Sequence, residues 1–464
     1  MLKMFDGVTE ISSGVIVPFH FEGDVLSLFL ANRLLTLETG KSTVIGQKHG
    51  SLFGNNTLFH LCLPLENYGL LNTLESDREV LDASISVGTI NQGVDYYIDH
   101  YEKDTTFTQM RFCFAELDYF VTSGSIYSID DMTGFIFSRK PVEVKRFELV
   151  YNEKSITFIL QTFSEIKCSY KSSAETKTEL VLEFEKTDDI DILIDLYHLV
   201  HGLFSFICNR QNITLVDVVL IGERVIKYTK RIEGKTIIEE KTKQSKQLLV
   251  PINKYCAEFE SDKTIGRTLN YSYLASNFDN LVAMFIDDIV SISSIHNSFS
   301  ARSLLDLKQC LHITAAFEYY QRSLLPEISS QSTQDVYTEI KKIIHKYSET
   351  QSGKKKRKSK DIANSLSPAI SLKEKIIKTY CGYQGWSGAK NILSTWFGDN
   401  IAEIAQMANT WRNELAHEKR EFEPDSRVID AMRLVEHLNY CIVLRKAGYS
   451  DDAIKVVLEK VLAR

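Results

Sequence analysis

The hydrophobic pattern changes its period part-way along this 464-residue chain, and this change limits the folds open to it. Up to about residue 185, short runs such as Val25–Leu30 and Glu179–Phe184 are separated by Gly, Asn and Asp, which is typical of strands and turns. From residue 303 onward, apolar residues recur every three or four positions, as in helices. The sequence therefore predicts an α+β protein: a β-rich N-terminal region, either a sandwich or an open barrel with added helices, followed by an all-α helical bundle.

The same pattern divides the chain into three parts. We expect a β-rich domain over residues 1–186, a mixed helix and strand continuation over 187–300, and a helical domain over 301–464. The serine-rich segment 291–302 marks the last boundary. Within the middle part, the lysine-rich residues 241–246 are predicted to be a connection that follows the strands.

Composition excludes several classes of protein. The formal net charge is −7 and the isoelectric point about 5.9, so the overall field does not favour nucleic acid and any RNA contact must be local. No signal sequence and no apolar run of roughly 18 residues is apparent, which predicts a cytoplasmic protein that does not bind a membrane. Eight cysteines lie singly without a C-x-x-C pair, and no phosphate-binding glycine loop occurs, so we expect no disulfide framework, bound metal or cofactor.

One segment of the helical region combines an apolar stripe with reactive side chains. In a helix over residues 401–417, the apolar stripe consists of Ile404, Ala408, Trp411 and Leu415. Asn413 and His417 lie four residues apart on the opposite side. Arg412 precedes His417 by five residues, so a regular helix separates them by roughly 140° and the long arginine side chain must bridge the difference.

These side chains could cleave RNA without a metal. His417 titrates near neutrality and could take the proton from a 2′-hydroxyl, which then attacks the adjacent phosphorus. Arg412 stays charged and could stabilise the negative charge that grows on the phosphoryl oxygens, while Asn413 adds neutral polar groups on the same patch. The alternative is that all three occupy the solvent face of an amphipathic helix.

The spacing R-N-x-x-x-H over Arg412 to His417, inside a C-terminal helical region, resembles the HEPN family of nucleotide-binding and RNase domains. Together with the β-rich region before it, the chain looks like the ApeA-type HEPN proteins of bacterial anti-phage defence. This resemblance implies that Arg412 and His417 are the catalytic pair and that Asn413 is the polar residue beside them. It also implies a homodimer or higher homo-oligomer, and an N-terminal region that senses a phage-derived trigger.

Glu318 is a candidate supporting residue. The helix predicted over residues 304–325 has two apolar stripes, so we expect it in the middle of the bundle; the first is Leu304, Leu307, Leu311, Ala315 and Leu325, the second Ile313, Phe317 and Leu324. Glu318 falls within the first stripe, where a carboxylate must find a donor or become protonated. Arg412 is one partner that would hold the guanidinium for phosphate. Arg322, four residues on, is the alternative.

A basic run follows the second helix of this region. Its six cationic residues are Lys354, Lys355, Lys356, Arg357, Lys358 and Lys360. Because glycine and serine surround them, we expect a mobile solvated loop. The run either attracts RNA phosphates independently of sequence or serves only solubility.

The leading functional hypothesis is a metal-independent HEPN endoribonuclease in anti-phage defence, an abortive-infection or toxin-like effector whose products end in 2′,3′-cyclic phosphate. The alternative is a non-catalytic HEPN module for dimerisation or for nucleotide or RNA binding. A nucleotidyl- or phosphoryl-transfer enzyme ranks below both, because neither metal-binding carboxylates nor a phosphate-cradling loop stands out.

Overall fold

The structure, a computed structural model of the chain, consists of two compact units, which are described separately. The first comprises Met1–Phe204 with Asn212–Gly266, and the second comprises Ser205–Gln211 with Arg267–Arg464. The residues that the structure describes are 4–12, 15–30, 41–48, 56–65, 88–121, 127–130, 134–137, 141–167, 173–232, 235–252, 260–303, 305–327, 331–365, 370–416 and 426–462.

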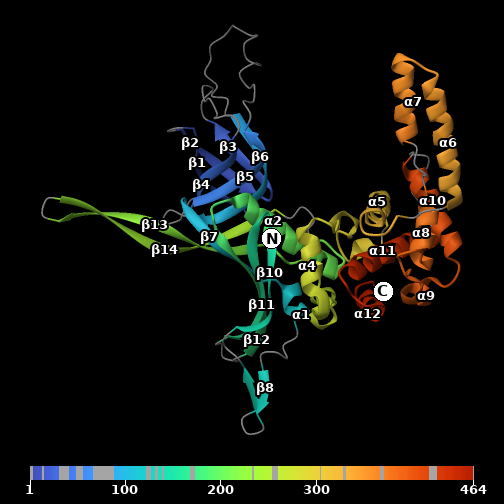
Figure 1. Cartoon of the computed structure of the whole chain (residues 1–464). Helices are drawn as coiled ribbons and strands as arrows, with labels where there is room; N and C mark the ends of the chain where they lie inside the picture. The colour runs from blue at the N-terminus through green and yellow to red at the C-terminus, as the bar shows by residue number, and fades with distance from the viewer. Residues whose placement is uncertain are drawn as a thin grey trace. The chain divides into compact units, whose positions relative to one another are not determined.

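The first unit begins with a small closed barrel (Figure 1). Its strands are β1 (Met4–Ser12), β2 (Val15–Glu22), β3 (Val25–Leu30), β4 (Lys41–Lys48), β5 (Asn56–Leu65) and β6 (Gly88–Tyr101). They follow the order β6-β3-β2-β1-β4-β5, and β5 pairs back with β6, which closes the barrel with antiparallel neighbours throughout. Aromatic side chains fill the interior: the rings of Phe19 and Phe59 lie 5.4 Å apart, and those of Phe21 and Tyr97 lie 5.3 Å apart. The sequence predicted a sandwich or an open barrel; the β-rich region is confirmed, but these six strands close into a barrel.

An open antiparallel sheet continues from β6. Its order is β10-β11-β12-β7-β13-β14, and β14 pairs with β6. The strands are β7 (Thr105–Phe112), β10 (Val142–Tyr151), β11 (Lys154–Lys167), β12 (Ser173–Thr187), β13 (Val218–Ile232) and β14 (Lys235–Pro251), with a separate hairpin of β8 (Tyr127–Asp130) and β9 (Gly134–Phe137). The alternate residues Ile156, Phe158 and Leu160 of β11 are buried, as a half-covered sheet requires.

The prediction that residues 241–246 form a connection after the strands is wrong. Lys241 pairs with Ile226 and Lys246 with Ile221, so the lysines lie inside β14. The pairing of β13 with β7 ends at Arg224, and beyond it β13 and β14 form a two-stranded ribbon (Figure 1). Lysines are tolerated in this ribbon because its sides are open to solvent.

Helix α2 (Ile190–Cys208) is the most apolar long helix of the described residues. Its length and apolar composition would suit a bilayer span, but 67% of its most apolar 18-residue stretch is buried inside the protein, as in a core helix. The helix ends where Asn209 adopts a left-handed conformation, with φ of 48°. On this helix His201 is buried and His198 is exposed.

The second unit is mostly helical. Its helices are α4 (Phe278–Ile286), α5 (Leu307–Ser323), α6 (Gln331–Glu349), α7 (Gly353–Ser365), α8 (Leu372–Cys381), α9 (Lys390–Phe397), α10 (Ile401–Ala416), α11 (Ser426–Lys446) and α12 (Asp451–Val461). Side-chain caps start three of them: Asp306 accepts a hydrogen bond from the Gln309 amide, Ser371 from Glu374 and Ser450 from Ala453. A β-rich region followed by a helical one is the predicted fold class.

The central helix of this unit is α11, buried along nearly its whole length between Val428 and Leu444 and packed against α5, α10 and α12. The sequence instead placed α5 in the middle, with two apolar faces. That expectation is wrong, because Ile313 and Phe317 are buried while Leu307 is exposed. The difference matters for Glu318, which lies on the half-exposed side of α5 and not in the core.

Candidate functional site

The predicted reactive segment forms the second half of α10. Three residues of its predicted apolar stripe, Ala408, Trp411 and Leu415, are buried as expected, whereas the fourth, Ile404, is only partly buried. Arg412 is partly exposed and Asn413 exposed, so both polar side chains lie at the surface of the helical unit. Helix α10 ends at Ala416, and His417 lies outside the described residues.

An ion pair between two helices orients Arg412. Its Nη2 lies 3.1 Å from Oε2 of Glu318 on α5, and the other Glu318 oxygen accepts a hydrogen bond of 3.1 Å from Nζ of Lys375 on α8. The side chains of Arg412 and Glu318 are 39% and 23% exposed, so water still reaches the guanidinium. The contact between Glu318 and Arg412 that the sequence offered as one alternative is therefore present.

The environment of Glu318 keeps it charged. Partial burial alone would raise the pKa of its carboxyl, but Lys375 and then Arg412 outweigh burial, and the pKa lies below its usual value. The carboxylate is therefore available as a fixed counterion at neutral pH. It limits the rotamers of Arg412 and leaves the rest of the guanidinium able to donate to another anion.

A shallow groove runs along the exposed side of α10. It has a volume of about 470 Å³ and is lined by Gln406 and Thr410 of α10 and by Lys373 of α8, among others. Gln406, Thr410 and Asn413 follow one another at intervals of four and three residues, so they share one face of the helix. Asn413 also accepts a long hydrogen bond, 3.4 Å, from Nη1 of Arg412. Gln406, Thr410 and Asn413, with Arg412 beside them, thus form the polar surface of α10.

Residues 25–216 match the model described as ApeA N-terminal domain 1, and residues 311–453 match the Apea-like HEPN model. The chain is an ApeA-like HEPN protein. No curated protein and no solved structure matches it. The HEPN match contains Glu318, Arg412, Asn413 and, in the sequence, His417; HEPN domains are typically RNases of defence systems.

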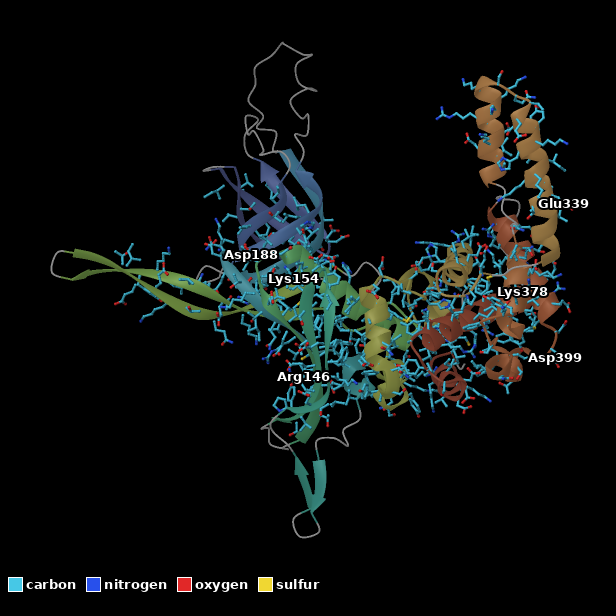
Figure 2. The ribbon with its side chains drawn as sticks, viewed as in Figure 1. Arg146, Lys154, Asp188, Glu339, Lys378 and Asp399 are labelled. Atoms are coloured by element: carbon cyan, nitrogen blue, oxygen red, sulfur yellow. The ribbon has the colours of Figure 1, made fainter. Side chains whose placement is uncertain are left out.

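The basic run of the HEPN domain is a helix, so the prediction of a loop is wrong. Residues 353–365 form α7, which lies beside α6 in a helical hairpin (Figures 1 and 2). Lysine and arginine favour helix, and Ser359 and Ala363, four residues apart, are buried on one side of α7. All six cationic side chains of this helix are exposed: Lys354, Lys355, Lys356, Arg357, Lys358 and Lys360.

Two parts of this surface were not predicted from the sequence. Lys375, the second cation on Glu318, lies on another helix, and nothing in its local sequence indicates the pairing. Gln406 and Thr410 could have been found, because they continue the spacing of Asn413 and His417 toward the start of α10. In the part of the chain that the structure describes, no three His, Cys, Asp or Glu side chains are grouped as metal ligands.

Proposed function

We propose that this ApeA-like HEPN protein is a metal-independent endoribonuclease of anti-phage defence, an abortive-infection or toxin-like effector that acts in the cytoplasm. The observation that supports this best is the ion pair of Arg412 with Glu318, which holds a partly exposed guanidinium beside Asn413 at the end of the motif helix. A held cation stabilises developing phosphoryl charge without reorganising during the reaction.

In this proposal His417 is the general base. It accepts the proton of a 2′-hydroxyl, whose oxygen attacks the adjacent phosphorus, and the 5′-oxygen leaves and is protonated by water. Arg412 stabilises the charge on the phosphoryl oxygens, and Asn413 orients the phosphate. The bond formed and the bond broken leave one product with a 2′,3′-cyclic phosphate and the other with a 5′-hydroxyl.

We further propose a homodimer in which two motif helices approach the same phosphodiester, since one Arg412 and one His417 supply few cationic groups. The β-rich N-terminal region would act as the sensor or regulator, with a phage-derived trigger as its ligand. Mixing an Arg412→Ala protomer with a His417→Ala protomer tests whether the two sites cooperate. Recovery of activity in the mixture, absent from either variant alone, would support a shared site.

The experiment that tests the nuclease is cleavage of labelled RNA by the full chain in the presence of EDTA. We expect wild type to cleave, and His417→Ala and Arg412→Ala to lose at least about a hundredfold in rate, since each removes a group used in the transition state. His345→Ala is the matched control, because His345 is an exposed histidine of α6 away from the motif helix. Cleavage that survives His417→Ala unchanged would contradict the assigned base.

The alternative function is a non-catalytic HEPN module for dimerisation or for nucleotide or RNA binding. It is favoured by the same ion pair, because an arginine already neutralised by Glu318 at 3.1 Å also suits a purely structural contact. In that case RNA is retained on a filter, or the dimer persists, with no cleavage under any condition of the same assay.

A further inference from the structure

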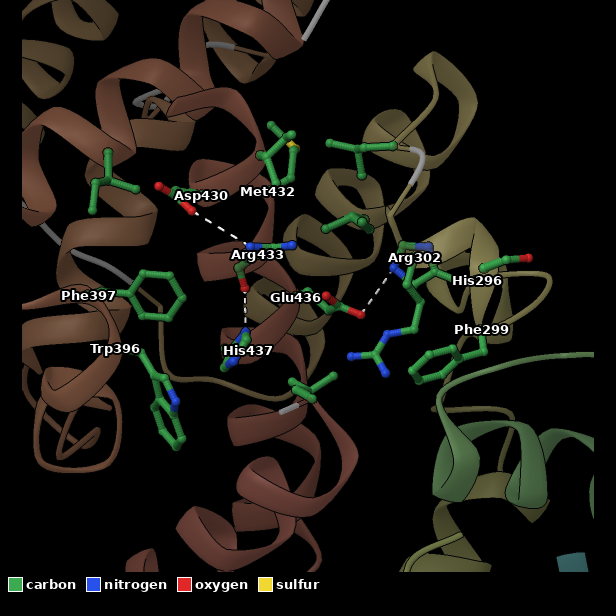
Figure 3. Close-up of a pocket in the computed structure, with 16 residues that line it drawn as sticks. His296, Phe299, Arg302, Trp396, Phe397, Asp430, Met432, Arg433, Glu436 and His437 are labelled. Atoms are coloured by element: carbon green, nitrogen blue, oxygen red, sulfur yellow. Dashed lines mark hydrogen bonds and ion pairs between the residues drawn. The ribbon is translucent and has the colours of Figure 1, made fainter. Parts of the chain in front are cut away.

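The helical unit, among its described residues, contains a second, larger concavity. This pocket has a volume of about 810 Å³ and lies between α9, α11 and the segment that precedes α5 (Figure 3). Neither Glu318, Arg412 nor Asn413 is among the residues that line it, so among the described residues it is distinct from the polar surface of α10.

Aromatic side chains form two opposite walls of the pocket. Figure 3 shows Trp396 and Phe397 of α9 on one side and Phe299 on the other. Trp396 is 37% exposed although it is the largest apolar side chain of α9, and a tryptophan left open on a concave surface can stack with a planar ring. Ile404 and Met432 add apolar lining, so the pocket suits a ligand with a flat apolar part.

Among the charged side chains that line the pocket, Arg302 is available to bind an anionic ligand. Glu436 is satisfied internally: its Oε1 accepts a hydrogen bond of 2.9 Å from Asn209 and lies 3.3 Å from Nε2 of His296. Asp430 lies 3.9 Å from Arg433 on the same helix. Arg302 makes no ion pair with any carboxylate that the structure describes, and its guanidinium lies 5.4 Å from the centre of the Phe299 ring. An anion that entered the pocket would therefore find Arg302 available.

His437 adds an acceptor. Its Nδ1 lies 2.7 Å from the carbonyl oxygen of Arg433 and so carries the proton in the neutral ring, which leaves Nε2 to accept a hydrogen bond. Burial is the main reason that the pKa of His437 is lowered, so the neutral ring prevails at pH 7. The ring lies 5.7 Å from that of Trp396 and 5.2 Å from that of Phe397.

We propose that this pocket binds a small planar aromatic compound that carries one anionic group, with Arg302 on the anion and Trp396 against the ring. An aromatic carboxylate and a ring-bearing phosphate share this chemistry. Such a site would give the HEPN domain a small-molecule ligand in addition to the RNA substrate proposed above, and it does not depend on that function.

Calorimetric titration of the full chain tests the proposal with defined probes. The anions are 2-naphthoate and phenyl phosphate, and the comparison compounds are neutral 2-naphthamide and inorganic phosphate, which lacks a ring. We expect at least one aromatic anion to bind one to one. 2-Naphthamide should bind about tenfold or more weakly than 2-naphthoate because it lacks the charged hydrogen bond. Inorganic phosphate should bind about tenfold or more weakly than phenyl phosphate because it lacks the ring that Trp396 contacts.

Variants locate the binding. Arg302→Gln and Trp396→Ala should each weaken the aromatic anion about tenfold or more, whereas Arg322→Gln and Tyr347→Ala, exposed controls outside the pocket, should not. Trp396 is partly exposed, so its variant is expected to fold even if Arg302→Gln does not. Failure of both anions to bind, equal binding of the amide, or equal binding by the Trp396→Ala chain would overturn the proposal.

Discussion

Glu318 on α5 and Arg412 on α10 are joined by an ion pair of 3.1 Å although 94 residues separate them in the chain. The same carboxylate accepts a hydrogen bond from Lys375, so one half-buried acid holds two cations from two further helices. The pairing fixes the direction of the guanidinium and contributes little to folding, because exposed or half-exposed pairs stabilise a protein by under about 1 kcal/mol. Its value is in positioning.

Glu318→Gln is therefore expected to impair RNA cleavage more than stability. The amide keeps the shape of the side chain but loses the charge that restrains Arg412, and we expect the cleavage rate to fall about tenfold with a melting temperature within a few degrees of wild type. In wild type the ion pair is present above the usual carboxyl pKa and is lost as the pH falls through the lowered pKa of Glu318. Once the pH is below this lowered pKa, the cleavage rates of the two proteins should converge.

The matched control is Glu374→Gln. Glu374 belongs to the same domain and pairs with Lys378, labelled in Figure 2, at 3.2 Å on the same helix, without touching Arg412. Its cleavage rate should equal that of wild type. An unchanged rate in Glu318→Gln would show that Arg412 needs no such anchor.

The exposed cationic residues of α7 are expected to contribute to RNA affinity through contacts with phosphates. Replacing Lys354, Lys356 and Lys358 by Gln should weaken binding and reduce the slope of log affinity against log salt by about 2, since each single-strand phosphate contact contributes roughly 0.7. Fluorescence anisotropy at several salt concentrations measures both quantities.

Three exposed lysines of the same domain provide the control for α7, namely Lys308, Lys446 and Lys460. Their triple Gln variant removes the same charge, so a change in slope confined to the α7 variant would attribute the effect to position. Equal slopes for the two triple variants would leave α7 with a role in solubility alone.

The hydrophobic period and the motif spacing in the sequence predicted which side of the motif helix is buried and which is exposed. The buried stripe of Ala408, Trp411 and Leu415 and the exposure of Asn413 follow from the turn of a helix, and both are present. The order of strands does not follow from local sequence, because β5 returns to β6 across the barrel and that pairing depends on the register of distant strands.

The predictions that were wrong concern segments whose side chains are exposed to solvent. The lysine-rich residues 241–246 were predicted to be a connection, but a strand whose sides are open to water accommodates charged residues. Residues 354–360 looked like a loop, but lysine and arginine have good helix propensity, and the small residues Ser359 and Ala363 let α7 pack on one side. Leu307 of α5 was predicted to be buried because it lies on an apolar stripe, but it is exposed, and exposed leucines are common in proteins.

Gly388 is expected to be essential for the loop between α8 and α9. Its φ is +78°, and a Cβ there would lie 2.5 Å from the amide nitrogen of Gly382. Gly388→Ala should therefore cost several kcal/mol, from both the strained backbone and the clash. Chemical denaturation measures the loss in the free energy of unfolding.

Gly398 separates the two causes. Its φ is also positive, +59°, but a Cβ there meets nothing within 4 Å. Gly398→Ala should show the backbone strain alone, about 1–3 kcal/mol. A cost for Gly388→Ala no larger than that of Gly398→Ala would mean that the loop shifts to make room.

The buried Glu436 should govern the acid stability of the helical unit. Burial alone would raise the pKa of its carboxyl, but the contacts with His296 and the hydrogen bond from Asn209 outweigh burial and hold the pKa at about 2. Because this pKa is below the unfolded value of 4.5, the stabilisation is complete above pH 4.5 and is lost as the pH falls toward 2. The free energy of unfolding should decline over that interval in wild type, and less steeply in Glu436→Gln.

Asn209→Ala tests the same network from the segment that follows α2. It removes the 2.9 Å hydrogen bond to a buried charge, so a loss of about 2 kcal/mol is expected at neutral pH. Glu459→Gln, an exposed residue of α12, is the control for removal of one carboxylate and should follow wild type at every pH. If the Glu436→Gln and Glu459→Gln curves have the same acid slope, the charge of Glu436 does not stabilise the native state, and its contacts with Asn209 and His296 act through packing alone.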